Sequence, residues 1–282
     1  MPDRSSIARF YPDSYWWSGK ERSRPRTARL LGRLERIYRE FVVSDHVRFL
    51  ERCAKARGLQ SASLLDIGCG IGTFIYLTSR RGYRVYGMDV SSTAVRLARD
   101  LYGLEARQGD IGSDAWAGHK FDFVSMFHVL EHLPDAAVAI EYASSLLKPE
   151  GSLIVQVPNV DSLQATLFGL RWYGLDVPRH LINFSPAGLN LLLERTGFRV
   201  TRAARFSLRD NPAALASSIA PFLDPIGRKG RRKRGHLLLE AAAEFLYFIL
   251  VAGSIPLAWA EGMVGRGATI WIEARRGDSV RR

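Results

Sequence analysis

Residues 63–74 read Ser-Leu-Leu-Asp-Ile-Gly-Cys-Gly-Ile-Gly-Thr-Phe, and this stretch decides the fold. The apolar run at its start predicts a short strand that is buried on both faces. Gly68, Gly70 and Gly72 permit positive φ and let the backbone approach a ligand closely. The spacing differs from the dinucleotide-binding G-x-G-x-x-G, because Thr73 takes the place of the last glycine. The pattern predicts a strand, a tight turn and a helix, and leaves open whether the turn holds a ligand.

A carboxylate at the end of the next predicted strand favours a nucleoside ligand. The strand predicted at 83–88 leads into Asp89, which stands 21 residues after Gly68. In nucleotide-binding α/β folds, an acidic side chain at this point accepts hydrogen bonds from ribose hydroxyls. Asp89 alone could equally be a loop carboxylate or a helix cap. Its distance from the glycine turn makes ribose binding the better interpretation.

Strands and helices alternate through the central part of the chain. The apolar pattern predicts further strands at 104–108, 121–127, 152–157 and 198–206. Helices are predicted at 27–57, 73–81, 93–102 and 135–147, with Pro134 suiting the first turn of the last one. Such alternation predicts an α/β fold with a parallel sheet and helices on both faces.

Charge is unevenly distributed along the chain. The 282 residues carry a net charge of +12, which divides into +7 over 1–60, −2 over 61–200 and +7 over 201–282. A nucleic-acid enzyme more often has its positive stripe beside the active site, so we do not expect nucleic acid as a partner. Basic flanks suit an anionic membrane surface at least as well. Cys53 and Cys69 form neither a disulfide framework nor a zinc spacing, which favours a reducing, cytoplasmic compartment.

Five successive segments resemble one enzyme family. They are LLDIGCGIGTF at 64–74, YGMDVS at 86–91, GDI at 109–111, FDFVSMFHVLEHLPD at 121–135 and LLKPEGSLIV at 146–155. In order and spacing they resemble the motifs of class I S-adenosylmethionine-dependent methyltransferases. Within that superfamily the chain is most similar to the small-molecule branch that includes the ubiquinone-biosynthesis O-methyltransferases. The resemblance implies a Rossmann-like, seven-stranded, mostly parallel sheet whose last strand, near 268–274, is antiparallel.

The resemblance also implies which residues would bind S-adenosylmethionine. Gly68, Gly70 and Gly72 would lie against its methionine and ribose part, and Asp66 would hold the amino group. The other expected contacts are Asp89 with the ribose, Val90, Asp110 and Ile111 with the adenine, and Phe127 and His128 beside the transferable methyl group.

The acceptor side is less well marked in the sequence. The sulfonium of the cofactor already activates the methyl group, so no metal is expected. An oxygen acceptor must still lose a proton, and His128, His132 and His180 are the candidate bases. The ubiquinone-biosynthesis enzymes have an acidic residue in place of His128, which puts a carry-over of their metal site and substrate in doubt. Candidate acceptor-binding residues are Trp172, Tyr173, Arg179 and Phe184, with plain packing as the alternative for the aromatic ones.

The C-terminal third combines a basic run with an apolar stretch. Six Lys and Arg residues at 228–234 stand directly before the strongly apolar segment 237–264. This pattern is typical of attachment to an anionic membrane surface. Both ends of the apolar segment lead into one domain, so a single crossing is excluded. We expect an interfacial helix pair or a shallow re-entrant hairpin, bent at Gly253 and Pro256. A helix pair that forms a homodimer interface or covers the pocket is the alternative.

We therefore expect four parts. They are an aromatic arm and basic helix at 1–60, a cofactor-binding core at 61–207, a basic and apolar helical insertion at 208–267, and a last strand with a basic tail at 268–282. The predicted activity is methyl transfer to an oxygen of a small molecule, glycan or lipid-linked intermediate, with the protein peripheral at the inner membrane face. An RNA methyltransferase and a non-catalytic scaffold of the same fold are the alternatives.

Overall fold

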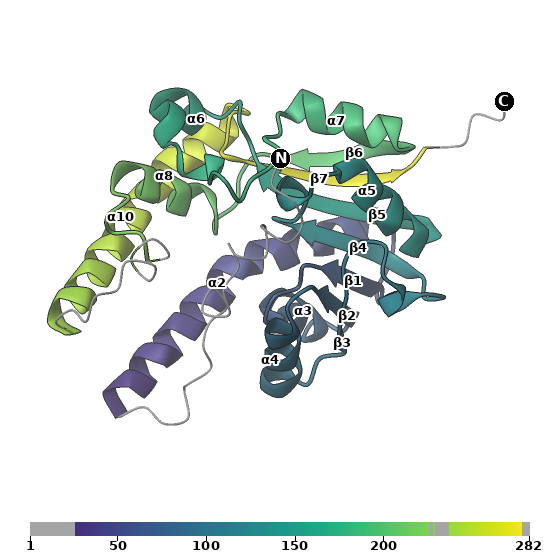
Figure 1. The fold of residues 1–282 in the computed structure, drawn as a ribbon, viewed down its shortest axis with the longest axis horizontal. Helices are drawn as coiled ribbons and strands as arrows, with labels where there is room; N and C mark the ends of the chain where they lie inside the picture. The colour runs from purple at the N-terminus through teal and green to yellow at the C-terminus, as the bar shows by residue number, and fades with distance from the viewer. Residues whose placement is uncertain (1–25, 226–227, 229–236, 278–282) are drawn as a thin grey trace.

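A computed structural model of the chain describes residues 26–225, 228 and 237–277 (Figure 1). The predicted aromatic arm, most of the basic run and the last residues of the basic tail lie outside these residues.

The core is a seven-stranded sheet with the strand order β3-β2-β1-β4-β5-β7-β6. The strands are β1 (Ser63–Ile67), β2 (Arg84–Asp89), β3 (Ala106–Gln108), β4 (Phe121–Phe127), β5 (Leu147–Pro158), β6 (Phe198–Ala204) and β7 (Thr269–Arg276). Strands β1 to β5 are parallel, and β7 runs antiparallel to both β5 and β6. The predicted Rossmann-like sheet with an antiparallel last strand is confirmed.

The strand order reverses between β1 and β4, which pair directly. The chain proceeds from β1 towards β3 on one side and from β4 towards β5 on the other. Loops that leave the carboxyl ends of β1 and β4 therefore diverge, and ligands of open α/β sheets bind in the crevice that this opens. The glycine turn follows β1, and His128 follows β4, so both lie at this reversal point.

Helices cover both faces of the sheet, as predicted. Apolar side chains of α5 (Ala136–Leu146) and α7 (Pro186–Arg195) pack on one face, together with Leu65 of β1. The other face is covered by α2 (Arg26–Ala56), α3 (Thr73–Ser79) and α4 (Ser92–Tyr102), which contact Leu64. Leu64 and Leu65 are buried against opposite faces of the sheet because successive side chains of a strand point in opposite directions.

Helix capping agrees with the sequence at α4 and differs at α5. Ser91 caps α4, and its hydroxyl accepts a hydrogen bond from the Ala94 amide. The cap of α5 is Asp135, whose carboxylate accepts from the amides of Ala137 and Val138. Pro134 therefore precedes the cap and is not in the first turn of the helix, because Asp135 can satisfy two free N–H groups that proline cannot.

The apolar C-terminal segment forms one continuous helix, α10 (Leu237–Met263), so the predicted bend at Gly253 and Pro256 is wrong. Its buried side chains recur at intervals of four and three residues and form one stripe, which consists of Tyr247, Val251, Ser254, Ala258 and Glu261. This stripe packs along α8 (Asn211–Ile219), which supports the helix across Gly253 and Pro256. Pro256 lies on the exposed side, where water can satisfy the carbonyl group that loses its partner. Figure 1 shows α8 and α10 extending away from the sheet at one end of the molecule.

Candidate functional site

The glycine turn after β1 depends on its glycines for two separate reasons. Gly68, Gly70 and Gly72 have φ values of 79°, 53° and 82°, in the left-handed region that other residues avoid. A Cβ on Gly68 would lie 2.5 Å from Val129, and one on Gly72 would lie 2.5 Å from Leu104. The turn thus keeps the backbone at the carboxyl end of β1 close to its neighbours and bare of side chains.

Asp89, at the end of β2, is buried and holds the turn. Its Oδ2 accepts a hydrogen bond from the Gly70 amide, and its Oδ1 accepts from the Ser91 amide, both at 2.8 Å. Burial raises the pKa of Asp89 above its usual value. The next residue, Val90, has an exposed side chain, and its carbonyl accepts a hydrogen bond from Gln108 at the end of β3. The two strand ends are thereby linked beside the turn.

Asp66 lies inside β1, immediately below the turn. Its Oδ1 accepts a hydrogen bond of 2.6 Å from the hydroxyl of Ser125 on β4. The side chain is buried, and this burial raises the pKa of Asp66 to about 7. A buried carboxylate of this kind gains stability when a ligand brings a positive charge next to it.

The third group of predicted cofactor residues follows β3. Asp110 is exposed, and one of its carboxylate oxygens accepts a hydrogen bond from the amide of Ile111. The Ile111 side chain is half-buried and packs against the main core. The structure therefore brings Asp66, Asp89 and Asp110 to the same edge of the sheet, at the ends of three adjacent strands.

His128 follows β4 and lies between two carboxylates. Its Nδ1 is 3.0 Å from Glu131 Oε1, and its Nε2 is 3.3 Å from Asp210 Oδ1. Burial by itself would lower the pKa of His128, but Asp210 and Glu131 outweigh it and raise the pKa to about 10. His128 is therefore an imidazolium at neutral pH, which makes it a poor general base.

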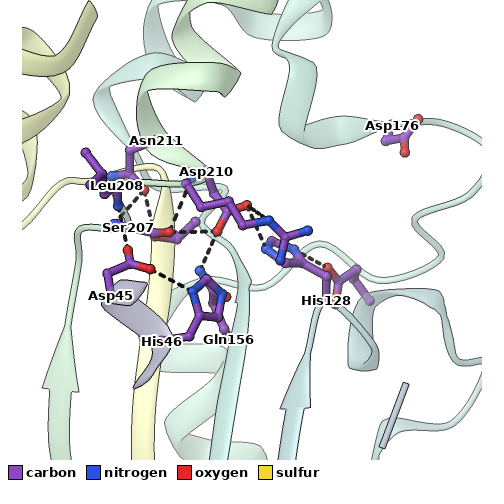
Figure 2. A network of polar contacts seen from close by, with 12 residues as sticks. Asp45, His46, His128, Gln156, Asp176, Ser207, Leu208, Asp210 and Asn211 are labelled. Atoms are coloured by element: carbon purple, nitrogen blue, oxygen red, sulfur yellow. Dashed lines mark hydrogen bonds and ion pairs between the residues drawn. The ribbon is translucent and has the colours of Figure 1, made fainter. Parts of the chain in front are cut away.

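Asp210 belongs to a network that joins distant parts of the chain (Figure 2). Its Oδ2 accepts hydrogen bonds of 2.7 Å from Gln156 Nε2 and from the Ser207 hydroxyl. The loop that carries Asp210 is fixed to α2, because the Leu208 amide donates to Asp45 Oδ2 at 2.7 Å. The His128 cation and Arg209 hold the pKa of Asp210 well below its usual value, against the effect of burial.

The neighbour of Asp45, His46, is buried beside the end of β4. Its Nδ1 lies 2.7 Å from Asp45 Oδ1, and its Nε2 has no hydrogen-bond partner among the described residues. The ring packs edge-on against Phe127 and Trp271, with centroid distances of 4.9 and 4.7 Å. Helix α2 thus closes the site above β4 with both an aromatic contact and a polar one.

Two further histidines, His132 and His180, lie next to each other near Glu131. His132 Nδ1 is 3.0 Å from the Arg179 carbonyl, and His180 Nδ1 is 2.8 Å from the Gly174 carbonyl. The two rings are 4.8 Å apart. Burial lowers the pKa of His180, which keeps this imidazole neutral at neutral pH. The segment 172–182 is held at the end of β4 because the amides of Leu181 and Ile182 donate to the Glu131 carbonyl.

The sequence profile of the methyltransferase-domain family matches residues 35–203, which is more than half of the chain. The chain belongs to this methyltransferase family. Its relatives include the ubiquinone biosynthesis O-methyltransferase of Azorhizobium caulinodans, which is 29% identical over 215 residues, covering 72% of this chain and 83% of the relative. The enzyme of the same name from Rhodopseudomonas palustris is 27% identical over 238 residues, covering 79% of this chain and 90% of the relative.

Solved structures confirm the fold of the methyltransferase. A protein assigned as a sarcosine dimethylglycine methyltransferase, from Galdieria sulphuraria, superposes with a TM-score of 0.57 at 15% identity, covering 83% of this chain and 86% of that one. The [4+2]-cyclase SpnF superposes with a TM-score of 0.53 at 20% identity, covering 82% and 80%. Because a cyclase shares the fold, the fold alone does not specify the reaction.

The residues at the carboxyl edge of the sheet fit S-adenosylmethionine, the cofactor of this methyltransferase. The turn from Gly68 to Gly72 offers a backbone surface that a Cβ would obstruct, and Asp66 is a buried carboxylate suited to an ammonium group. The hydroxyl of Thr73 is buried and has no hydrogen-bond partner in the described part of the chain, as expected of a group that hydrogen-bonds to a ligand. When bound, the cofactor supplies the activated methyl group.

The predicted acceptor residues of the methyltransferase occupy different environments. Arg179 pairs with Asp176 at 2.7 Å, close to His132, and Tyr173 is half-buried with its amide bonded to Ser218. Trp172 is buried, and its Nε1 has no partner within the described ranges. Phe184 packs inside the main core, so its position gives no support to a role in acceptor binding.

Three residues of the site had no signal in the sequence. Asp45 and His46 lie in α2, a long basic helix, and Asp210 lies in the loop before α8. None belongs to a motif, and only the packing of α2 and of this loop over β4 brings them to His128. Gln156 lies near the carboxyl end of the apolar strand β5. It could have been noticed as a polar residue in a buried strand.

The described residues also contain one group that could ligate a metal ion. One ligand atom from each of Glu131, His132 and His180 lies within 4.8 Å of the others. The expectation that methyl transfer here needs no metal stays a prediction.

Proposed function

We propose that this methyltransferase transfers the methyl group to a hydroxyl oxygen of a small molecule, a glycan or a lipid-linked intermediate. His180 carries the proposal. A hydroxyl must lose its proton during methylation, and a neutral imidazole near the end of β4 is suited to accept it. Its Nδ1 hydrogen bond to the Gly174 carbonyl leaves Nε2 as the proton acceptor. The similarity to relatives that are named O-methyltransferases supports the same acceptor atom.

The three candidate histidines take different roles in this proposal. His180 is the base, and burial keeps it neutral. His132 packs against His180 and orients it, while its own Nδ1 is held by the Arg179 carbonyl. His128 is a fixed cation that would favour an anionic acceptor oxygen over a neutral one. Trp172, Tyr173 and Arg179 border the acceptor on the segment that carries His180.

Transfer of labelled methyl groups tests the proposal. The wild-type enzyme and His180→Gln are incubated with labelled S-adenosylmethionine and a panel of phenols, catechols, polyprenyl phenols, sugars, amines and RNA. We expect label on a hydroxyl compound, with kcat lowered about 10²- to 10⁴-fold in His180→Gln, as for loss of a general base. The affinity for S-adenosylhomocysteine should be unchanged in this variant.

Two controls make the result decisive. His119→Gln changes an exposed histidine just before the amino end of β4, whereas His128 follows the carboxyl end. This variant should leave kcat unchanged. Label found on an amine or on RNA would contradict O-methylation. Full activity of His180→Gln on a hydroxyl acceptor would remove His180 as the base.

A further inference from the structure

One helix of the molecule exposes far more apolar surface than its role in the fold requires. From residue 245 to 260, α10 contains no charged residue. Outside the stripe that packs on α8, it exposes Phe245 (68%), Leu257 (66%) and Trp259 (55%), together with Leu246, Ile249 and Met263. Soluble monomers rarely expose a contiguous apolar surface of this kind without a partner.

The basic run stands directly before this helix in the sequence. Arg228 begins the run, and its guanidinium donates to the Glu240 carbonyl at 3.4 Å and lies 4.0 Å from the Glu244 carboxylate. The run ends where α10 begins, at Leu237. Both ends of a segment with six positive charges and no negative one are therefore held at the N-terminal half of α10. Positive charge beside an exposed apolar helix complements an anionic bilayer.

The C-terminal end of α10 is fixed to the catalytic domain. Glu261 accepts hydrogen bonds from both the backbone amide and the side-chain amide of Gln164, at 3.1 and 2.8 Å. Residues 242–263 are long and apolar enough to span a membrane, but this contact and the start of β7 at Thr269 keep the helix end beside the sheet. Fixed at this end and packed along α8, the helix can lie in the membrane interface.

The exposed face also borders the acceptor side of the site. Gln164 lies in α6 (Leu163–Phe168), which leads into the segment of Trp172 and His180. This segment exposes Leu167 (75%), Leu170 (95%) and Val177 (75%), and the Tyr173 amide bonds to Ser218 of α8. Apolar surface thus continues from α10 to the elements that would receive the acceptor.

From these observations we infer that the exposed face of α10 is a docking surface for an anionic lipid bilayer. The exposed face of α10 enters the interface in the plane of the membrane, and the positive charge that precedes α10 in the sequence favours anionic headgroups. The segment 163–180 then faces the bilayer, so a lipid-linked acceptor reaches the enzyme without leaving the membrane. Only this last point rests on the proposed function, because docking itself requires no acceptor.

Flotation with vesicles tests the docking surface on the full chain. Vesicles of phosphatidylcholine alone, or with 30% phosphatidylglycerol, are mixed with the wild type, with Phe245→Ser/Leu257→Ser/Trp259→Ser, and with a control. The control, Leu101→Ser/Val138→Ser/Leu191→Ser, replaces three exposed apolar residues on α4, α5 and α7. We expect the wild type and the control to float with anionic vesicles and the α10 variant to bind at least about tenfold more weakly, since each buried side chain contributes.

A charge variant separates the two parts of the surface. Arg231→Gln/Arg232→Gln/Lys233→Gln/Arg234→Gln should weaken binding to anionic vesicles more than about tenfold and leave binding to neutral vesicles unchanged. Wild-type protein that stays with the soluble fraction, or equal flotation of the α10 variant and the control, would overturn the inference. So would a dimer in sedimentation that the α10 variant dissociates while vesicle binding is absent, because α10 would then be a subunit interface.

Calorimetry with S-adenosylhomocysteine is measured on every variant. Retained binding shows that the α10 variant is folded. Vesicle docking without any methyl transfer to a hydroxyl would contradict the proposed function and leave the docking surface standing.

Discussion

At the scale of single residues, Asp89 holds the glycine turn with the same carboxylate that is predicted to bind the ribose. Two backbone amides already occupy part of its carboxylate, which fixes the glycine turn before any ligand arrives. A ribose that hydrogen-bonds to the same carboxylate meets a side chain with little rotamer freedom left to lose. Preorganisation of this kind raises affinity by lowering the entropy lost on binding.

Asp66 gives the cofactor site a pH dependence. Since burial raises its pKa to about 7, the carboxyl group is half protonated at neutral pH, and a ligand ammonium group requires the deprotonated form. We expect the affinity for S-adenosylhomocysteine to rise about tenfold between pH 6 and pH 8, because the deprotonated fraction of Asp66 rises from about one tenth to about nine tenths over this range. Isothermal titration calorimetry at several pH values measures this.

The control for this prediction is Asp66→Asn, which keeps the shape of the side chain and cannot ionise. It should bind more weakly and show a flat profile over the same pH range. An unchanged slope in this variant would assign the titration to another group.

At the scale of elements, the glycine turn can be tested through two glycines with similar backbone angles. Gly72 (φ 82°) lies against Leu104 and Ala98, whereas Gly82 (φ 87°) has open space where a Cβ would stand. Gly82→Ala should lower the free energy of unfolding by about 1–2 kcal/mol through left-handed strain alone. Gly72→Ala should cost a further ~1–3 kcal/mol for overpacking.

Urea denaturation of both variants measures the difference. Equal losses at the two positions would show that Leu104 and Ala98 move aside without cost. The turn would then require glycine for its conformation and not for the space around it.

The sequence predicted those elements that depend on local pattern. The strand from Phe121 to Phe127 has the predicted bounds, since a mostly apolar run between Lys120 and His128 marks its ends. The prediction from the sequence was wrong at α10, where Gly253 and Pro256 have low helix propensity. Packing of the Tyr247–Glu261 stripe on α8 outweighs that propensity, and no local pattern reveals which helix will lie alongside.

At the scale of the whole molecule, the same limit applies to the site. The residues predicted to bind the cofactor follow the strands of one continuous motif series, so the sequence predicted that they lie at one edge of the sheet. His128 was also predicted, but its carboxylate partner Asp210 stands 82 positions later, and the Asp45 that fixes the Asp210 loop stands 83 positions earlier. Three segments meet there only after the chain has folded, so their pairing had no signal in the sequence.

Asp210→Asn should therefore lower the free energy of unfolding of the protein as well as disturb the site. Loss of one partner from a fully buried ion pair costs about 3–5 kcal/mol, and the partly buried pair of His128 and Asp210 should cost less. His128 has a raised pKa in the fold, so its contribution is complete below pH 6.5 and is lost as pH rises through about 10. The contribution of Asp210, whose pKa is lowered, is lost in acid.

The difference in unfolding free energy between wild type and Asp210→Asn should consequently be largest near pH 6 and shrink towards pH 10. Urea denaturation across this range measures it, and NMR titration of His128 follows the pKa directly. A difference that does not vary with pH would show that Asp210 acts through Gln156 and Ser207 and not through the charge of His128.

The position of β7 has a consequence for biosynthesis. In the sheet, β6 pairs only with β7, and β7 is separated from it by the insertion that contains α10. During translation, β6 must wait with both edges open until residues 269–276 have emerged. Throughout that interval α8 and the apolar α10 are already synthesised, next to a sheet that is still incomplete. Nascent chains of this enzyme should therefore need protection from aggregation late in synthesis, after most of the cofactor site has formed.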